Sequence, residues 1–350
     1  MHKNYFLPHI ARMEGYTPGE QPQQGQFIKL NTNENPYSPS PLVLERLQEA
    51  CREDLRLYPD SEASGVRRRL GEIFAVSPGQ TLVGNGSDEL LSIIMRSFAG
   101  AGQKVVYPAP TYSYYKKLIQ IQNAEEIVVD FDDTFSLPQD LFCENARITL
   151  LANPNSPSGT LIPYETIEEL AARISGILVV DEAYVDFAAG GCIDLVNKYS
   201  NTIVLRTMSK SFSLASMRLG FGFAAAELIA GLWKVKDHYN VNRLSLVAAE
   251  AALDDIEWMR ANAERVCKTR KDLTSGLERL GFSVWDSAAN FVLARIDKPG
   301  ANWLYQELKK HHILVRYFNQ DRLRDCLRIS VGTDQEIETC LRQLENLLMS

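Results

Sequence analysis

Two cations eight residues apart, Lys210 and Arg218, stand out in the stretch RTMSKSFSLASMRLGFG, residues 206–222. The lysine follows an apolar run typical of a strand and lies between two serines. A lysine in such a place is most often a solubilising surface charge. It can instead be a nucleophile that bonds covalently to a carbonyl group, provided that other side chains assist it. Which of these applies depends on the residues that the fold brings near Lys210.

Two groups of candidate residues follow other short apolar runs. The run TLV is followed by GNGSD, residues 84–88, and then by a helical pattern. Glycines beside the free N–H groups of a helix N-terminus form an anion site, for which phosphate is the usual ligand. A turn in which Ser87 or Asp88 caps the helix explains the same residues without a ligand. The run ILVV ends at Asp181, an acid that could hold a cation, a metal ion or a protonated ring nitrogen, or could cap the next helix.

An aromatic residue and a polar loop follow two further runs. Tyr112 comes shortly after KVVYPAP, and Asn155 and Ser156 belong to the loop after ITLLA. One ligand needs all of these groups: pyridoxal 5′-phosphate has a phosphate, a flat ring, a ring nitrogen that a carboxylate keeps protonated, and an aldehyde that bonds to a lysine. The combined pattern therefore favours a pyridoxal-phosphate site around Lys210.

The apolar runs alternate with helical patterns over residues 41–240. Short runs without polar alternation, separated by helices, predict an α/β fold with a mostly parallel sheet sandwiched by helices. In such sheets ligands bind beyond the carboxyl ends of the strands, where the candidate residues lie. We therefore expect a large cofactor-binding domain over 41–240. Residues 1–40 predict an irregular arm without helix or strand, and residues 241–350 predict a smaller α+β domain.

Composition excludes several classes of protein. The chain has 350 residues and a formal net charge of −7, which argues against nucleic-acid binding. No apolar run is long enough for a membrane span or a signal peptide. The six cysteines form no C-x-x-C pair, and the five histidines form no H-E-x-x-H motif, so we expect no metal site. These features predict a cytoplasmic protein that binds small molecules, and neither nucleic acid nor membrane.

Three rival readings fit the motifs poorly. Residues 220–225, GFGFAA, loosely match a dinucleotide-binding G-x-G-x-x-A, but they lie inside a predicted strand and not in the turn after it. An ATPase would need a G-x-x-x-x-G-K-[ST] loop, which the sequence lacks. A cofactor-binding transcriptional regulator would need an attached DNA-binding module, and the chain has neither the room nor the charge for one.

The order of the motifs resembles the fold-type-I pyridoxal-phosphate aminotransferases, and among them the histidinol-phosphate aminotransferase family. The resemblance runs nearly end to end. The pieces that carry it are YTPGEQP, LNTNENPYSPSP, LYPD, GNGSDE, PAPTYSYY, NPNSPSGT, VVDEAYVDF, RTMSKSFSLASMRLGFG, YNVNRLS, ILVRYF and LRISVGT. The resemblance implies transamination of L-histidinol phosphate with 2-oxoglutarate, giving imidazole-acetol phosphate and L-glutamate, a step of histidine biosynthesis. An aromatic-amino-acid aminotransferase and a phosphothreonine decarboxylase share most pieces and remain alternatives.

The resemblance also implies roles for residues at the cofactor. Lys210 would bond covalently to the cofactor aldehyde, Asp181 would pair with the ring nitrogen, Tyr184 would hydrogen-bond the ring hydroxyl, and Tyr112 would stack on the ring. The cofactor phosphate would be held by Gly86, Ser87, Asp88, Ser209 and Arg218. Tyr58 would reach the phosphate in the partner subunit, so that the active site would need a homodimer.

The resemblance implies a substrate site as well. Arg328 would grip the α-carboxylate of glutamate or 2-oxoglutarate, for which a planar, bidentate arginine is suited. Tyr16, Asn85, Tyr239 and Arg316 would line the substrate pocket. The chain departs from the family at one place: many relatives have an asparagine directly before Pro157, where this chain has Ser156 preceded by Asn155. Serine could make a weaker contact with the ring hydroxyl, Asn155 could substitute for it, or Tyr184 could act alone.

Overall fold

The central element is a mostly parallel β-sheet. The computed structural model describes residues 5–15, 20–21, 25–142 and 145–349. In this part of the chain, seven strands form one sheet, in the order β2 (Thr81–Gly84), β8 (Gly220–Ala224), β7 (Thr202–Thr207), β6 (Ile177–Asp181), β5 (Ile148–Ala152), β3 (Lys104–Ala109) and β4 (Glu125–Asp130). All neighbours pair in parallel except β8, which is antiparallel to both β2 and β7. The predicted α/β class is confirmed.

Helices cover both faces of this sheet because its central strands are apolar on both sides. Every residue of β5 is buried, and its successive side chains point to opposite faces. Leu150 belongs to the core formed with α4 (Gly86–Phe98), α5 (Tyr114–Ile121) and α8 (Ala226–Trp233), whereas Leu151 belongs to the core on the other face. The second face is covered by α3 (Ser64–Phe74), α6 (Tyr164–Arg173) and α7 (Leu195–Lys198).

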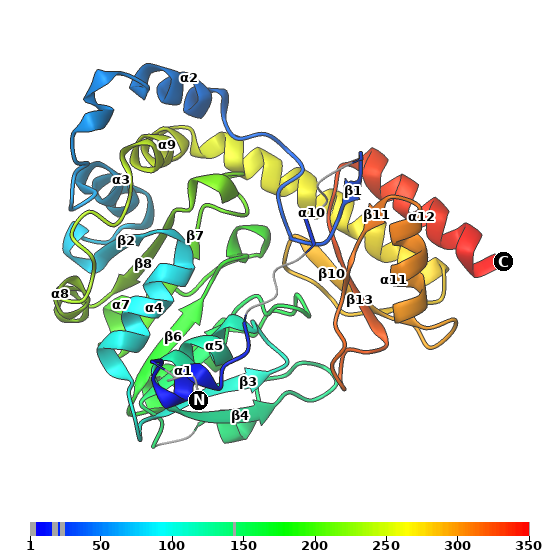
Figure 1. Cartoon of the computed structure of the whole chain (residues 1–350), viewed down its shortest axis with the longest axis horizontal. Helices are drawn as coiled ribbons and strands as arrows, with labels where there is room; N and C mark the ends of the chain where they lie inside the picture. Colours follow the sequence, from blue (N-terminus) through cyan, green and yellow to red (C-terminus); the bar gives the residue numbers. More distant parts are fainter. Residues whose placement is uncertain (1–4, 16–19, 22–24, 143–144, 350) are drawn as a thin grey trace.

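A second sheet belongs to the C-terminal part of the chain. Four antiparallel strands follow the order β12 (Arg316–Tyr317), β13 (Cys326–Ser330), β10 (Phe291–Arg295) and β9 (Ser283–Val284). The helices α10 (Ile256–Arg279), α11 (Ala301–Lys310) and α12 (Asp334–Met349) pack on it. Figure 1 shows the two sheets side by side, with α10 running from one part to the other.

The division of the chain at residue 240 remains a prediction. The helix α9 (Arg243–Asp254) packs against α2 (Pro41–Ala50) and α3, and therefore lies with the large sheet. Short 3-10 turns occupy Glu53–Arg56, Pro78–Gln80, Gln139–Leu141, Val185–Phe187 and Ala215–Met217. None of the helices in the described ranges is long and apolar enough to cross a membrane.

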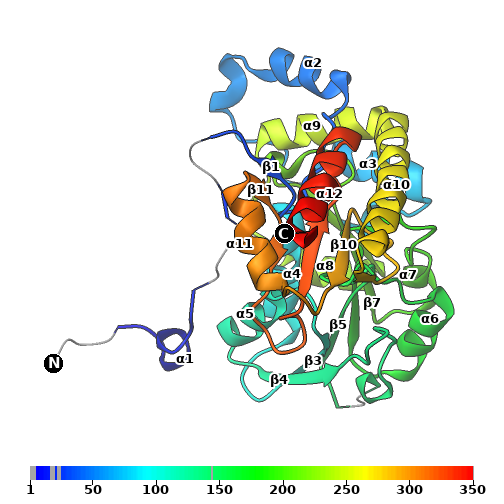
Figure 2. The same ribbon diagram turned by 90° about the vertical axis from the view of Figure 1, so that its right-hand side faces the viewer.

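The expectation that residues 1–40 lack helix and strand is wrong. The arm contains α1 (Pro8–Ala11) and the two-residue strand β1 (Ile28–Lys29). β1 pairs in parallel with β11 (Ile313–Leu314), and Figures 1 and 2 both place the two strands together. A strand of two residues is too short to show an alternating pattern, and its partner lies far along the sequence. The pairing carries the next residues, 30–35, into the space between the two sheets.

Candidate active site

One cavity collects the strand ends of the large sheet. Asp181 ends β6, and in the register it faces Ala152 at the end of β5 and Leu205 in β7. The lining residues are Gly86, Ser87, Asp88, Tyr112, Ala152, Pro154, Ser156, Asp181, Ala183, Tyr184, Thr207, Ser209, Lys210 and Arg218. Nine of the residues singled out from the sequence as cofactor ligands, Lys210 included, thus line a single cavity, as expected for the carboxyl edge of a parallel sheet.

The start of α4 and Arg218 form the cationic end of the cavity. Gly86 has a φ of +75° and Arg218 a φ of +51°, so both lie in the left-handed region. A Cβ atom on Gly220 would lie 2.5 Å from the backbone nitrogen of Ser87, so only glycine lets β8 approach the start of α4 this closely. The first N–H groups of a helix and a guanidinium form a site suited to an anion such as a phosphate.

Asp88 orients the two groups beside it. One carboxylate oxygen is 3.2 Å from Nη2 of Arg218, and the other accepts a hydrogen bond of 3.0 Å from the hydroxyl of Tyr112. A carboxylate repels a phosphate, so this side chain acts through Arg218 and Tyr112 and contacts an anion only through its backbone N–H. The ring of Tyr112 is thereby fixed along one wall of the cavity.

Asp181 is a buried acid without a cationic partner among the described residues that contact it. It is 4% exposed, and it accepts hydrogen bonds from the hydroxyl of Tyr115 at 3.0 Å and from the backbone nitrogen of Ala183 at 3.2 Å. Burial raises the pKa of Asp181 to about 6, with a smaller contribution from the negative charge of Asp88. A cation placed against this carboxylate would lower that pKa, so the site suits a protonated ring nitrogen.

Lys210 lies where the cavity opens toward the N-terminal segment. Its Nζ atom is 3.4 Å from the carbonyl oxygen of Thr32 and 5.6 Å from the ring centre of Tyr184. The backbone around the lysine is fixed, because the Asn35 side chain donates hydrogen bonds to the carbonyl oxygens of Lys210 at 3.1 Å and Ser211 at 3.0 Å. The backbone of Lys210 is therefore fixed, whereas rotation about its side-chain bonds can still move the amine.

A buried ion-pair network supports this loop from beneath. Glu182, which is fully buried, pairs with Arg206 at 2.9 Å, and Arg206 lies 3.5 Å from Asp186. The carboxylate of Asp186 accepts a hydrogen bond from the hydroxyl of Ser211, next to the lysine. A buried ion pair with further hydrogen bonds is costly to break because the remaining charge has no partner. This network contributes to holding the Lys210 loop in place.

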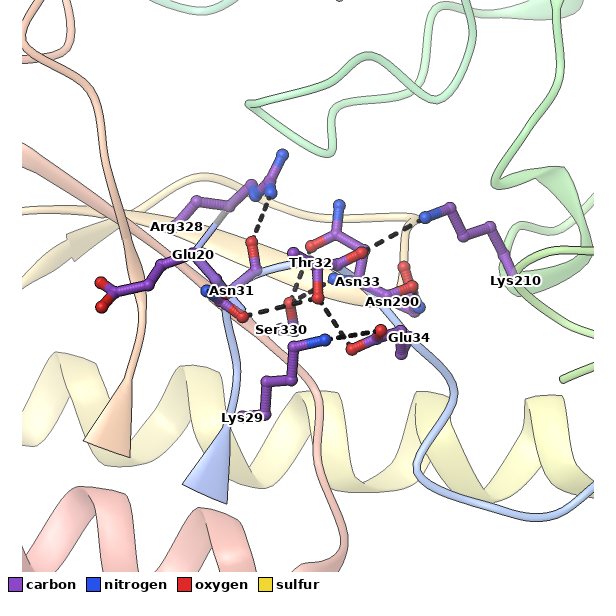
Figure 3. Close-up of polar contacts among 10 residues, drawn as sticks. All are labelled: Glu20, Lys29, Asn31, Thr32, Asn33, Glu34, Lys210, Asn290, Arg328 and Ser330. Carbon is purple, nitrogen blue, oxygen red and sulfur yellow. Dashed lines mark hydrogen bonds and ion pairs between the residues drawn. The ribbon is translucent and has the colours of Figure 1, made fainter. Parts of the chain in front are cut away.

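The residues after β1 reach the same site from the N-terminal arm (Figure 3). The Asn33 side chain donates a hydrogen bond of 3.0 Å to the hydroxyl oxygen of Tyr184, and Ser330 at the end of β13 hydrogen-bonds Asn33. The sequence analysis did not single out Asn33. The only signal in the sequence was its place in the motif NTNENP, and no spacing rule connects that motif with Tyr184 or Ser330.

A second cavity adjoins the first and holds two arginines. It shares Tyr112, Ser156, Tyr184 and Lys210 with the first cavity, so the lysine stands at the boundary. Its other lining residues are Asn31, Thr32, Asn33, Thr111, Ser113, Pro157, Arg316, Phe318, Gln320, Leu323 and Arg328. The guanidiniums of Arg316 and Arg328 come from the small sheet, and they suit a substrate with anionic groups.

Arg328 is held at the mouth of this second cavity. It donates hydrogen bonds to the carbonyl oxygen of Asn31 at 3.0 Å and to the hydroxyl of Ser156 at 3.3 Å. Ser156 lines both cavities. The serine directly before Pro157 therefore contacts the arginine predicted to bind a carboxylate.

Four predicted site residues lie outside both cavities, and their roles stay predictions. The Asn155 side chain donates one hydrogen bond of 2.8 Å to Ser158 in its own loop and one of 3.2 Å to the carbonyl oxygen of Pro110, just after β3. The Asn85 side chain donates to the carbonyl oxygen of Asn240. Tyr58 and Tyr239 stack on each other at 4.4 Å and are 78% and 49% exposed. Tyr16 lies outside the described residues.

Comparison with known proteins defines the class to which the fold and site belong. Residues 25–344 match the family described as aminotransferase class I and II, and the chain belongs to this family. Within it, the chain is 44% identical to "Histidinol-phosphate aminotransferase 1" of Trichormus variabilis, with 99% of both chains covered. It is also 44% identical to the histidinol-phosphate aminotransferase of Geotalea uraniireducens, with 97% of this chain and 98% of that one covered. The resemblance seen in the motifs is confirmed.

Solved structures agree with this assignment. The histidinol-phosphate aminotransferase of Sinorhizobium meliloti, whose crystal structure contains pyridoxal-5′-phosphate, superposes with a TM-score of 0.90 at 26% identity. The comparison covers 99% of this chain and 98% of that chain. An L-threonine-O-3-phosphate decarboxylase from Porphyromonas gingivalis superposes with a TM-score of 0.83 over 92% of this chain and 99% of that chain, and its 21% identity shows the shared fold alone.

Proposed function

We propose that the chain is a pyridoxal-phosphate-dependent aminotransferase that converts L-histidinol phosphate and 2-oxoglutarate into imidazole-acetol phosphate and L-glutamate. One observation carries the proposal: Lys210 stands at the boundary between two cavities. The first cavity has a buried acid and a cationic end, and the second has two arginines. The names of the relatives support the substrate pair.

The first cavity fits the cofactor. The cationic end of the cavity, at Ser87 and Arg218, suits the cofactor phosphate. The ring of Tyr112 can stack on the cofactor ring, and the buried carboxylate of Asp181 can pair with the ring nitrogen. The raised pKa of Asp181 indicates a site for a cation, because a buried carboxylate is stabilised strongly by a positive charge beside it. When bound, the cofactor supplies an aldehyde carbon and a protonated ring that withdraws electrons from the substrate.

The residues of the chain then have distinct tasks. Asp181 would hold the proton on the ring nitrogen, and Tyr184 would hydrogen-bond the ring hydroxyl. With substrate bound, Nζ of Lys210 would accept a proton from the substrate Cα as general base and deliver it, as general acid, to the aldehyde carbon that the cofactor supplies. Because the backbone of Lys210 is fixed, this proton transfer needs only rotation of the lysine side chain and no movement of the loop.

The second cavity fits substrates that carry anionic groups. Arg328 is placed to bind the α-carboxylate of glutamate or 2-oxoglutarate, and Arg316 to bind the phosphate or the carboxylate at the other end. A neutral aromatic side chain would leave one guanidinium without a partner, which disfavours an aromatic-amino-acid aminotransferase. No observation favours a decarboxylase, since the likeness to the threonine-phosphate enzyme is confined to the fold.

A homodimer with shared sites is part of the same proposal. Tyr58 and Tyr239 form an exposed stacked pair, and Leu55 and Leu57 beside Tyr58 are also exposed. Exposed apolar side chains gathered in one segment are typical of a surface that another chain covers. A biosynthetic aminotransferase of this kind would act in the cytoplasm.

The decisive test combines a spectrum with a substrate panel. The purified protein should show a visible absorption band from its lysine-bound cofactor, and Lys210→Ala should lose both the band and transamination. Lys271→Ala, at an exposed position of α10, is the matched control and should keep both. With 2-oxoglutarate as acceptor, histidinol phosphate should react at least ~100-fold faster than phenylalanine, since an unpaired buried charge costs several kcal/mol. Phosphothreonine should give no decarboxylation. Transamination by Lys210→Ala would refute the proposal.

A further inference from the structure

The amide of Asn33 lies between the two parts of the molecule (Figure 3). Asn33 is 2% exposed and has a left-handed φ of +56°. Tyr184, which its side chain contacts, lies just beyond β6 of the large sheet, and Ser330 ends β13 of the small sheet. A buried amide with partners on both sides has its orientation set by those partners.

The hydrogen bonds with Ser330 determine which way the amide points. The backbone nitrogen of Asn33 donates to the hydroxyl oxygen of Ser330 at 2.9 Å, so this oxygen is an acceptor there. The proton of the same hydroxyl is donated to Oδ1 of Asn33 at 2.7 Å. Because Oδ1 accepts, the NH₂ group is on the opposite side and faces Tyr184.

This orientation makes the hydroxyl oxygen of Tyr184 an acceptor. Nδ2 of Asn33 lies 3.0 Å from it and has only protons to offer. The phenol proton of Tyr184 must therefore point in another direction. Among the described residues no acceptor for this proton lies within hydrogen-bond distance, and Tyr184 lines both cavities.

We infer that Asn33 is a positioning residue that aims the hydroxyl proton of Tyr184 into the cavity, toward an anionic oxygen of the ligand. The inference rests on the proposed function, in which that oxygen is the ring oxygen of the cofactor. Ser330 is the second member of the unit, because it fixes the amide of Asn33. Arg328 lies two residues before Ser330 on β13, so the strand that presents the substrate arginine also orients the cofactor tyrosine.

In the holoenzyme, the pH at which Nζ of Lys210 loses its proton depends on where the Tyr184 hydroxyl points. A hydrogen bond donated to the ring oxygen draws negative charge away from Nζ, so the bound lysine loses its proton at a lower pH. If the donor is lost, the proton is held more tightly, and the pH midpoint of the visible absorption band rises. This readout needs the holoenzyme but no substrate and no turnover.

The test uses Asn33→Gly, which tolerates the positive φ and keeps the backbone hydrogen bonds of residue 33. We expect its midpoint to rise by up to about one pH unit, the size expected for a lost hydrogen bond to a charged group. Tyr184→Phe should show a rise at least as large. Adding Asn33→Gly to Tyr184→Phe should cause no further rise, because Asn33 acts through the hydroxyl. Ser330→Ala should shift the midpoint in the same direction by less.

Asn290→Ala is the matched structural control. The Asn290 side chain donates a 2.9 Å hydrogen bond to the backbone oxygen of Asn33 and leaves the amide of Asn33 alone. It should leave the midpoint where the wild type has it. An unshifted midpoint in both Asn33→Gly and Ser330→Ala, or an equal shift in the Tyr184→Phe background, overturns the inference while the proposed function stands. If the wild type has no titrating visible band, the proposed function fails, and this inference with it.

Discussion

The carboxyl group of Asp181 ionises at a higher pH than an exposed aspartate does, as long as no cation lies beside it. Its pKa is raised by burial from 3.8 to about 6. Between these values the folded protein binds more protons than the unfolded chain, so the free energy of unfolding falls as the pH rises through this window. The group is fully favourable below about pH 4, and above about pH 6 it opposes folding of the cofactor-free protein.

Asp181→Asn should therefore stabilise the cofactor-free protein at pH 7.5. The shift from 3.8 to about 6 corresponds to a gain of up to about 3 kcal/mol in the free energy of unfolding. Urea unfolding at pH 7.5 and at pH 4 measures it, and the difference from the wild type should vanish at pH 4. Activity should fall by at least ~100-fold, since nothing then keeps the ring nitrogen protonated. A variant less stable than the wild type at pH 7.5 would contradict this account.

At this scale the sequence predicted the residues that lie directly after strands. Lys210 and Asp181 could be found because the carboxyl ends of parallel strands meet at one edge, and Arg218 because it lies in the same short stretch as Lys210. Asn33 could not, because its partners Tyr184 and Ser330 are far away in sequence and become neighbours only when the two sheets meet. The position of Asn155 was equally hidden, since the turn of its loop decides whether Asn155 or Ser156 faces the cavity.

At the scale of secondary structure elements, the contact between β8 and the start of α4 forms the cationic end of the cavity. Gly220 of β8 lies against the backbone of Gly86 and Ser87, with room for a hydrogen atom only. This explains why the glycines of GFGFAA belong to a strand and not to a nucleotide-binding turn. The strand β8 and the start of α4 thus have to keep a separation set by glycine.

Gly220→Ala should weaken cofactor binding. The added Cβ would lie 2.5 Å from the backbone of Gly86 and Ser87, which must move apart from β8. Overpacking of this kind typically costs about 1–3 kcal/mol, so the Kd for the cofactor should rise about tenfold or more. Titration of the cofactor-free protein, followed by absorbance, measures the change.

Gly222→Ala is the control for that experiment. Residue 222 lies on the same face of β8, but its Cβ would meet the end of the flexible Leu205 side chain at 2.8 Å. We expect nearly unchanged affinity. An equal loss in both variants would show that the strand as a whole, and not its approach to α4, determines affinity.

The sequence was informative for elements that are long or wholly apolar. The strands of the large sheet were predicted because each apolar run extends over at least four residues, whereas the four-residue helix α7 was missed. β1 and β11 have two residues each and were missed. Their pairing is a tertiary contact, and local propensity carries no information about it.

At the scale of the whole molecule, the exposed pair of Tyr58 and Tyr239 is proposed to contribute to a site only when a second chain lies beside it. Mixed dimers test this. If Tyr58 serves the partner's site, chains with Lys210→Ala and chains with Tyr58→Ala complement each other, because one site of the mixed dimer has both residues. Random mixing should recover about a quarter of the wild-type activity, as half of the dimers are mixed and each has one intact site.

The control is the activity of each variant alone, which should be absent for Lys210→Ala and low for Tyr58→Ala. If Tyr58 acts within its own chain, no mixed dimer contains an intact site, and mixing would recover nothing. In a single chain Tyr58 is 78% exposed and outside both cavities, so its predicted place at the partner's site still rests on the family resemblance.

The parallel pairing of β1 with β11 has a consequence for synthesis of the protein. Ile28 leaves the ribosome early, while its partner Ile313 comes near the end of translation. At roughly 5–20 residues per second, tens of seconds separate the two. A nascent chain can fold its large sheet during this interval, yet β1 still lacks its partner strand and Asn33 still lacks Ser330. Newly made chains therefore complete the contacts of the segment from Ile28 to Asn33 only after Ser330 has been translated.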